Sequence, residues 1–255
     1  MANIGKLVVL IHQAVSFNRV MVRIPQAEAV FWPGCALMTL EGHILNRTLA
    51  VLKRAEPDIQ LACACCGNPS TCLFPQKAKV RKKKLLKLLS DRGVKRIYTA
   101  CPNCTLQLRD FGLEVRPIWP VLAEYLTEED MAAVSGSYVW HDPCPTRQDA
   151  VQQEAVRKIL ALRSCDWMEP QCSGCKTICC GNRKMLHCTD PEKSARLRKA
   201  RVAQFPENRI VASSCEGCLS AFRTEKRETA HLLEMLFGKS ESRGWGNRMK
   251  NTWKK

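Results

Sequence analysis

The stretch CACCGN at residues 63–68 contains two adjacent cysteines followed directly by a glycine. The stretch ICCGN at residues 178–182 repeats this arrangement. Glycine has no side chain, so it allows the backbone to approach a bound group closely. We therefore expect Gly67 and Gly181 to contribute backbone N–H groups at the rim of a group held by the cysteines.

The second doublet lies 114 residues after the first, and other cysteines align at the same offset. The CxxC pair at residues 101–104 falls on the pair at residues 215–218 without a gap, and VFWPGC pairs with VWHDPC upstream. The halves read C-x29-CC-x34-C-x2-C and C-x34-CC-x34-C-x2-C. This self-similarity predicts two copies of one structural unit. The matched, candidate metal-binding cysteines are Cys35, Cys65, Cys66, Cys101, Cys104, Cys144, Cys179, Cys180, Cys215 and Cys218.

The other six of the sixteen cysteines have no counterpart in the opposite copy. They are Cys63, Cys72, Cys165, Cys172, Cys175 and Cys188. Because a residue type kept in both copies is expected to serve the shared chemistry, we expect these six to be small buried hydrophobic side chains. Cys172 and Cys175 are set apart, since the stretch CSGCKTICC is dense enough in cysteine to hold a metal.

Short β-branched or aromatic runs end at the matched cysteines, as in AVFWPGC, RIYTAC and RIVASSC. Helical patterns lie between them over residues 38–54, 76–92 and 146–163. This alternation predicts an α/β fold with two tandem units, each a small parallel sheet flanked by helices. Ligand groups of such sheets collect at the carboxyl ends of the strands, where the cysteines occur.

Four segments follow from the repeat and from composition. The expected organisation is an N-terminal extension over residues 1–27, a first domain over 28–127, a second over 137–238 and a basic, disordered tail over 239–255. No stretch approaches the roughly 20 apolar residues of a membrane span, and no signal peptide is recognised. We therefore expect a cytoplasmic, reducing location, with any membrane contact made through a partner.

The formal net charge is +16, and much of it is concentrated in residues 77–96, which contain ten Lys or Arg and one acid. The spacing of Leu85, Leu88 and Leu89 predicts a helix with a basic outer face. Such a face is either solvated or docks onto an acidic partner subunit. Binding of nucleic acid is a third option, but no known reader motif supports it, so no nucleic-acid partner is expected.

Five matched cysteines per copy exceed the needs of common metal sites. A structural zinc ion and a cubane [4Fe–4S] cluster each take four ligands. Adjacent cysteines also suit a cluster of several irons better than one small ion, because their side chains diverge. The pattern therefore favours an iron–sulfur cluster with more than four thiolates around it.

The pattern C…CCG…CxxC, present twice, resembles the CCG (cysteine-rich) domain. That family includes the cysteine-rich subunit of heterodisulfide reductase and the iron–sulfur subunits of anaerobic glycerol-3-phosphate dehydrogenase, glycolate oxidase and lactate-utilisation complexes. The resemblance extends over about residues 28–238, and FWPGCAL and HDPC are similar to the openings of the family's two copies. It implies two [4Fe–4S] clusters of the non-cubane type, each ligated by the five cysteines of one copy.

The resemblance implies an oxidoreductase subunit that reduces a disulfide. An alternative is an electron-transfer subunit that connects a flavoprotein dehydrogenase with a quinone or ferredoxin, and a third is a zinc-binding protein that contacts nucleic acid. No ferredoxin-type C-x2-C-x2-C-x3-C-P spacing occurs, so we expect electrons to arrive from a ferredoxin-like or flavoprotein partner. No catalytic residue is assigned, although His141 is a candidate for a supporting role beside the ligands.

Overall fold

The computed structural model describes residues 2–253, and the chain divides into two compact units. Unit 1 combines the chain up to Ile118 with the segment from Ser240 onward, and unit 2 consists of Trp119–Lys239. The division thus falls before residue 127, the expected end of the first domain. The C-terminal segment also returns to the first unit instead of ending beyond the second.

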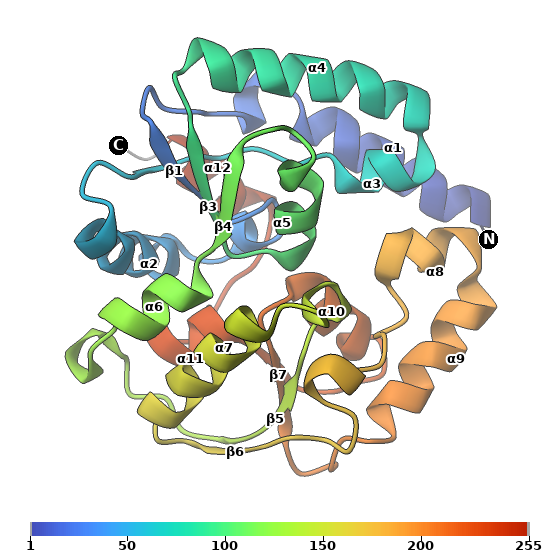
Figure 1. The fold of residues 1–255 in the computed structure, drawn as a ribbon. Coiled ribbons are helices and arrows are strands. Elements are labelled where there is room, and N and C mark those ends of the chain that lie inside the picture. The colour runs from blue at the N-terminus through green and yellow to red at the C-terminus, as the bar shows by residue number, and fades with distance from the viewer. Residues whose placement is uncertain (1, 254–255) are drawn as a thin grey trace. The chain divides into compact units, whose positions relative to one another are not determined.

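Unit 1 is built on four parallel strands in the order β2-β1-β3-β4. Figure 1 labels β1, β3 and β4 of this sheet. The strands are β1 Ala29–Trp32, β2 Gln60–Leu61, β3 Arg96–Thr99 and β4 Glu114–Pro117. The α-helices are α1 Ala2–Ser16, α2 Gly42–Ala55, α3 Asn68–Leu73, α4 Pro75–Asp91, α5 Pro102–Arg109 and α12 Trp245–Trp253. Short 3₁₀ turns occur at Arg19–Met21 and Leu37–Thr39.

Unit 2 repeats this arrangement with the strand order β6-β5-β7-β8, again all parallel. The strands are β5 Ser137–His141, β6 Asp166–Met168, β7 Ile210–Ser213 and β8 Thr229–His231. The α-helices are α6 Trp119–Tyr125, α7 Ala150–Leu162, α8 Leu186–Thr189, α9 Pro191–Val202, α10 Glu216–Arg223 and α11 Leu232–Phe237. Short 3₁₀ turns occur at Glu128–Asp130, Cys144–Thr146, Gly174–Lys176 and Arg183–Met185.

The central strands of both sheets are buried along most of their length. Every residue of β1 is buried, as are the last four of β5. A parallel sheet covered on both faces requires such continuous apolar runs, whereas a sheet with one wet face alternates. The predicted α/β fold with two tandem parallel sheets is therefore confirmed, and the matched cysteines follow the carboxyl ends of the strands.

The expectation of a disordered tail is wrong for the described part of residues 239–255. Helix α12 packs against α2 and the Leu37–Thr39 turn of unit 1. Its polar side chains point inward: Arg248 donates a hydrogen bond to the Ser16 hydroxyl, and Asn251 donates to the Met38 and Leu40 carbonyls. The polar side chains of this segment therefore hydrogen-bond buried groups of unit 1. Composition alone could not distinguish such a helix from a solvated, disordered tail.

Replacing Asn251 with alanine is expected to lower the free energy of unfolding by about 2 kcal/mol, because two buried carbonyl acceptors lose their donor. Urea unfolding measures this loss. The matched control is Asn247→Ala, which removes an amide that lies partly in solvent. Equal stability of the two variants would contradict the inferred role of α12.

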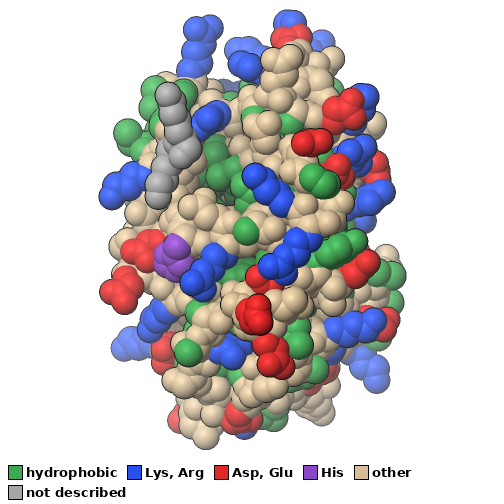
Figure 2. Space-filling model, turned by 90° about the vertical axis from the view of Figure 1, so that its left-hand side faces the viewer, with side chains coloured by type: hydrophobic (Ala, Val, Ile, Leu, Met, Phe, Trp, Pro, Cys, Tyr) green, Lys and Arg blue, Asp and Glu red, His purple; other side chains and the backbone are tan. Residues whose placement is uncertain are grey.

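None of the described helices is long and apolar enough to cross a membrane. Lys and Arg side chains are distributed over the face drawn in Figure 2, with Asp and Glu among them. The basic stretch predicted at residues 77–96 forms α4, whose Leu85 and Leu89 are buried.

Candidate metal centres

The first copy brings all five matched thiols into one connected chain. Cys35 Sγ lies 3.9 Å from Cys65 Sγ. The adjacent Cys66 is in hydrogen-bond contact with Cys104, and Cys104 with Cys101. Cys65, Cys66 and Cys104 are buried, whereas Cys35 and Cys101 are half-buried.

The second copy arranges its thiols in the same way. Cys144 Sγ lies 4.0 Å from Cys179 Sγ. Its neighbour Cys180 contacts Cys218, and Cys218 contacts Cys215. Two copies with different surrounding sequence thus share one order of thiol contacts, which is the arrangement expected of a duplicated binding site.

Strand ends and helix starts position these thiols. In unit 1, Cys35 lies in the turn after β1, and the doublet lies between β2 and α3. Cys101 is the N-cap residue of α5, and Cys104 lies in the first turn of that helix. The free N–H groups and the positive end of a helix stabilise nearby thiolates. Cys215 and Cys218 occupy the same places at the start of α10.

The glycine after each doublet has a left-handed backbone and donates to a thiol. Gly67 has φ +82° and its N–H lies 3.4 Å from Cys65 Sγ, while Gly181 has φ +85° and its N–H lies 3.3 Å from Cys179 Sγ. A Cβ on Gly181 would lie 2.3 Å from the Ser194 carbonyl oxygen. Glycine is therefore required at this position by both conformation and space.

In each chain the first cysteine of the doublet has a lowered pKa, and in the first chain hydrogen bonding by Cys104 also lowers the pKa of Cys101. Hydrogen bonding by Cys35, and then by Cys66, lowers the pKa of Cys65 well below its usual value. The same contact raises the pKa of Cys35. In the second copy, hydrogen bonding by Cys144 lowers the pKa of Cys179 to about 2. The donor set of each chain thus favours a sulfur anion at the first cysteine of the doublet.

The first centre also has a buried amide that the sequence did not reveal. Gln13, on α1, donates from its amide nitrogen to Cys65 Sγ at 3.5 Å. Its amide oxygen accepts a hydrogen bond from Ser70 at 2.7 Å, and Ser70 is also contacted by Arg81. Gln13 lies in the segment assigned to an N-terminal extension, so nothing in the cysteine pattern could connect it with the doublet.

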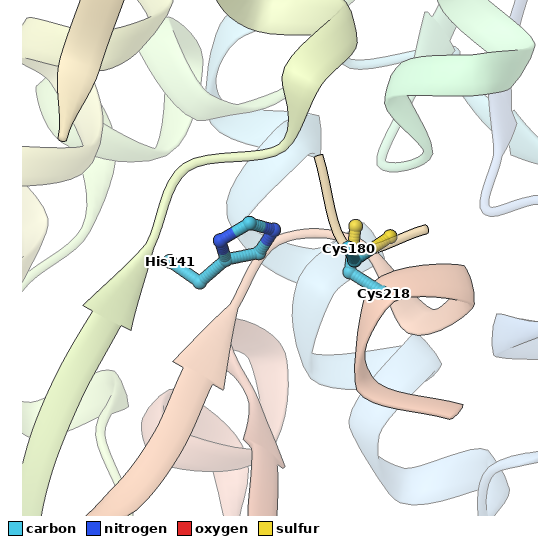
Figure 3. A group of neighbouring side chains, drawn as sticks. All are labelled: His141, Cys180 and Cys218. Atoms are coloured by element: carbon cyan, nitrogen blue, oxygen red, sulfur yellow. The ribbon is translucent and has the colours of Figure 1, made fainter. Parts of the chain in front are cut away.

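The second centre has a histidine beside its sulfurs (Figure 3). The His141 ring at the end of β5 points toward Cys180 and Cys218, and its nearest nitrogen lies within 4.8 Å of both sulfurs. All three side chains are buried. Burial, followed by the nearby Arg201 charge, lowers the pKa of His141 to about 3, so its ring is neutral at physiological pH.

The partner of the other ring nitrogen fixes which nitrogen of His141 carries the proton. Arg201 Nε donates to His141 Nδ1 at 3.0 Å. A guanidinium only donates, so Nδ1 must accept and Nε2 must carry the hydrogen. His141 Nε2 has no hydrogen-bond partner among the described residues. This side chain therefore presents an N–H donor, not a free lone pair, toward the sulfurs.

Arg201 is a fully buried cation in the same centre. Its Nη1 donates to the Cys172 carbonyl and the Gln204 side chain, each at 2.7 Å, while its Nη2 has no partner among the described residues. Burial lowers the pKa of Arg201 to about 10, so it remains charged at neutral pH. Arg201 ends a run of basic residues that is typical of a solvated face, so its burial could not be predicted from the charge pattern.

Asp142 fixes the turn between β5 and Cys144. Its carboxylate accepts hydrogen bonds from Arg157, at 2.5 and 2.6 Å, from Trp140 Nε1 at 2.9 Å and from the Gly174 N–H at 2.7 Å. Burial opposes ionisation, but these donors lower the pKa of Asp142 below its usual value. The first copy has Pro33 at the position that matches Asp142. Proline has no carboxylate, so the turn before Cys35 lacks these hydrogen bonds.

The unmatched cysteines do not share one environment. Cys63 and Cys188 are buried, and Cys63 donates to the Asn251 carbonyl at 3.4 Å. Burial raises the pKa of Cys63 to about 12, so it stays a neutral thiol. Cys72, Cys165 and Cys172 are half-buried. Cys175, which the sequence set apart with Cys172 as a possible metal ligand, is exposed.

The residues present fit an iron–sulfur cluster in each centre. Five thiols converge, and glycine N–H groups point at sulfur. His141 Nε2 and Arg201 Nη2 are buried donors to which the described part of the chain offers no acceptor. Trp32 Nε1, three residues before Cys35, is likewise buried without a partner among the described residues. Donors of this kind hydrogen-bond the sulfurs of a bound cluster and offset its negative charge.

Two solved structures with detectable similarity are both distant. An aspartate racemase from Picrophilus torridus is 10% identical, with a TM-score of 0.36, and the alignment covers 88% of this chain and 98% of that one. A glutamate racemase from Aquifex pyrophilus is 13% identical, with a TM-score of 0.32, over 82% of this chain and 80% of that one. Similarity at this level does not support an activity for this chain.

A comparison with curated proteins gives no significant match. The family model for the cysteine-rich domain CCG matches residues 29–109 and again residues 138–223. The two matched segments contain all ten cysteines of the two thiol chains. Together with the sixteen cysteines, this match is compatible with iron–sulfur binding. The chain therefore belongs to the family of CCG cysteine-rich domain proteins, with two tandem copies of the domain.

Proposed function

We propose that this chain is the iron–sulfur subunit of an oxidoreductase that reduces disulfides, similar to the cysteine-rich subunit of heterodisulfide reductase. Each five-thiol chain would hold one [4Fe–4S] cluster of the non-cubane type. The observation that carries the proposal is the identical order of five connected thiols in both copies. A second copy of a five-sulfur site is difficult to explain by zinc, which takes four ligands.

The protonation of His141 is a further argument against zinc. A histidine that binds zinc offers a nitrogen lone pair and usually donates from the other ring nitrogen to an acceptor. Here Nδ1 accepts from Arg201, so a lone pair at Nε2 would require an imidazolate anion. Donation of Nε2–H to a sulfur of a cluster satisfies both nitrogens without that cost.

When bound, the clusters would supply electrons one at a time, whereas a disulfide needs two electrons and two protons to form two thiols. The chain's own residues prepare for this charge. The N–H groups of Gly67 and Gly181 stabilise sulfur anions.

Each centre also has a buried arginine nearby: Arg248 acts on Cys35 of the first centre, and Arg201 contacts His141 of the second. We propose that the second centre has the higher reduction potential, because His141 Nε2 and Arg201 Nη2 are two buried donors without a partner among the described residues, whereas Trp32 Nε1 is one such donor at the first centre. The electrons would come from a ferredoxin-like or flavoprotein subunit.

A second candidate is an electron-transfer subunit without catalysis, passing electrons from a flavoprotein to a quinone or ferredoxin. Deep burial favours it: Cys66, Cys104, Cys180, Cys215 and Cys218 are each at most 5% exposed. A disulfide substrate must reach a centre, whereas an electron need not. Reaction with a disulfide therefore separates the two functions.

The test uses 2-hydroxyethyl disulfide as substrate and reduced methyl viologen as electron donor, with the anaerobic holoprotein. We expect thiol release and a change in the EPR spectrum of a cluster when the disulfide is added. Neither change, with both clusters present and reducible, would exclude disulfide reduction and leave the electron-transfer function.

The variant His141→Phe tests the proposed asymmetry. Loss of one hydrogen bond, worth about 1 kcal/mol, should lower the potential of the second cluster by about 40 mV. The reduced cluster carries the extra negative charge, so removal of a donor disfavours it. The matched control is Trp32→Phe at the first centre. A shift of the same cluster in both variants, or of neither, would contradict the assignment.

A further inference from the structure

Helix α1 exposes its apolar face. The side chains of Ile4, Leu7, Val8, Ile11 and Val15 are 68%, 55%, 59%, 56% and 37% exposed, respectively. Their spacing of three or four residues places them in one stripe along the helix. Lys6 is the only charged side chain of α1. A surface helix normally has the reverse arrangement, with its apolar stripe facing the core.

The orientation of α1 is fixed by the polar side chains on its buried face. Gln13 and Ser16 are each 0% exposed. Gln13 hydrogen-bonds both Cys65 and Ser70, while Ser16 accepts from Arg248 at 2.9 Å. Rotation of the helix to bury its apolar stripe would break these contacts. The exposed stripe is therefore a built feature of unit 1.

The apolar surface continues from α1 onto α12. The Trp245 ring lies 5.4 Å from the His12 ring, and Trp253 Nε1 donates to the Val20 carbonyl at 2.7 Å. Trp245 and Trp253 are 41% and 53% exposed. Met249, between them at helical spacing, is also exposed. Half-exposed tryptophans beside an apolar stripe are typical of surfaces that enter a lipid–water interface.

A basic groove of about 960 Å³ adjoins the end of α1. Its apolar walls include Phe17, Val22 and Leu88, and Arg81 lies over the Phe17 ring at 5.0 Å. Five cationic side chains line the groove, and none of the lining residues is acidic. They are Arg19, Lys77, Arg81, Lys84 and Arg92. An apolar groove with only positive charges is complementary to anionic amphiphiles.

We propose that unit 1 docks onto an anionic lipid bilayer, with α1 lying in the interface and the basic groove facing the lipid headgroups. The stripe would enter the acyl boundary, while the cations would attract anionic headgroups. A helix of fifteen residues spans about 22 Å, so it lies along the surface instead of crossing it. Self-association through this face is disfavoured, since two copies would bring two basic grooves together.

The test is sedimentation of the holoprotein with vesicles of phosphatidylcholine and phosphatidylglycerol at equal proportions. The variant Leu7→Glu/Ile11→Glu places two acids in the stripe, and we expect at least a tenfold loss of vesicle binding. Both side chains are exposed, so folding and iron content should not change. The matched control is Val151→Glu, a similarly exposed apolar residue on α7 of unit 2, which should bind like the original protein.

Binding should also fall with rising salt and on vesicles of phosphatidylcholine alone. Equal binding by the double variant and the original protein would overturn the proposal, as would no binding to the anionic vesicles. Sedimentation velocity without lipid gives a third outcome. A dimer that Leu7→Glu/Ile11→Glu converts to a monomer would overturn the proposal by showing that a second copy covers the stripe. These readouts do not depend on disulfide activity, so failure here leaves the proposed function standing.

Discussion

Replacing Asp142 with asparagine is expected to destabilise unit 2 by about 3 kcal/mol, as measured by urea unfolding at neutral pH. The Asp142 side chain is 2% exposed and pairs with Arg157 through both carboxylate oxygens. An amide keeps one acceptor oxygen but brings an NH₂ group against the guanidinium and the Gly174 N–H. Arg157 then loses both of its hydrogen bonds to a buried carboxylate and keeps Glu169, whose side chain is 36% exposed, as its charged partner.

The matched control is Asp166→Asn, which removes another aspartate–arginine pair in the same unit. Asp166 lies 3.0 Å from Arg209, but its side chain is 57% exposed. Exposed pairs contribute about 0–1 kcal/mol, so this variant should unfold almost like the original protein. A similar loss of unfolding free energy in the two variants would contradict the view that the buried donors around Asp142 stabilise the turn before Cys144.

Serine in place of one doublet cysteine should remove one cluster and leave the other. We expect Cys66→Ser to lose about half of the iron and sulfide, and Cys180→Ser to lose the other half, because each thiol connects two parts of its chain. Iron and acid-labile sulfide assays on anaerobic protein measure the loss. The EPR spectra of the two variants should add to that of the original protein.

Cys63→Ser is the control for a buried cysteine next to the doublet. Cys63 is 2% exposed, comparable with Cys66 at 5%, but its thiol faces the Asn251 carbonyl and not the thiol chain. This variant should keep all of its iron. If Cys63→Ser lost as much iron as Cys66→Ser, the inference that only cysteines matched between the two copies bind a cluster would be wrong.

The spacing of the cysteines predicted the fold and the two groups of five matched thiols. Each cysteine follows the end of a strand, and the carboxyl ends of parallel strands meet at one edge of a sheet. The duplication placed each CxxC at the start of a helix, where α5 and α10 begin. The supporting residues could not be found in this way. Gln13 reaches Cys65, and Arg201 reaches His141, only through the packing of α1 and α9. The matched positions of the other copy hold Thr127 and Lys87.

The C-terminal segment shows another limit of composition. Its polar and basic residues are typical of disorder, yet Arg248 and Asn251 are buried against unit 1. The same composition describes a solvated chain and a helix whose polar groups satisfy backbone carbonyls. The helix differs from the solvated chain in the hydrogen-bond acceptors of Asn251, the Met38 and Leu40 carbonyls, which lie about two hundred residues away in the sequence.

The central claim is that each five-thiol chain holds an iron–sulfur cluster, and the metal content of the protein tests it most directly. Protein purified anaerobically from iron-replete cells should be brown and contain about eight irons and eight sulfides per chain, with little zinc. Stoichiometric zinc with no iron or sulfide, in a colourless protein, would contradict the account.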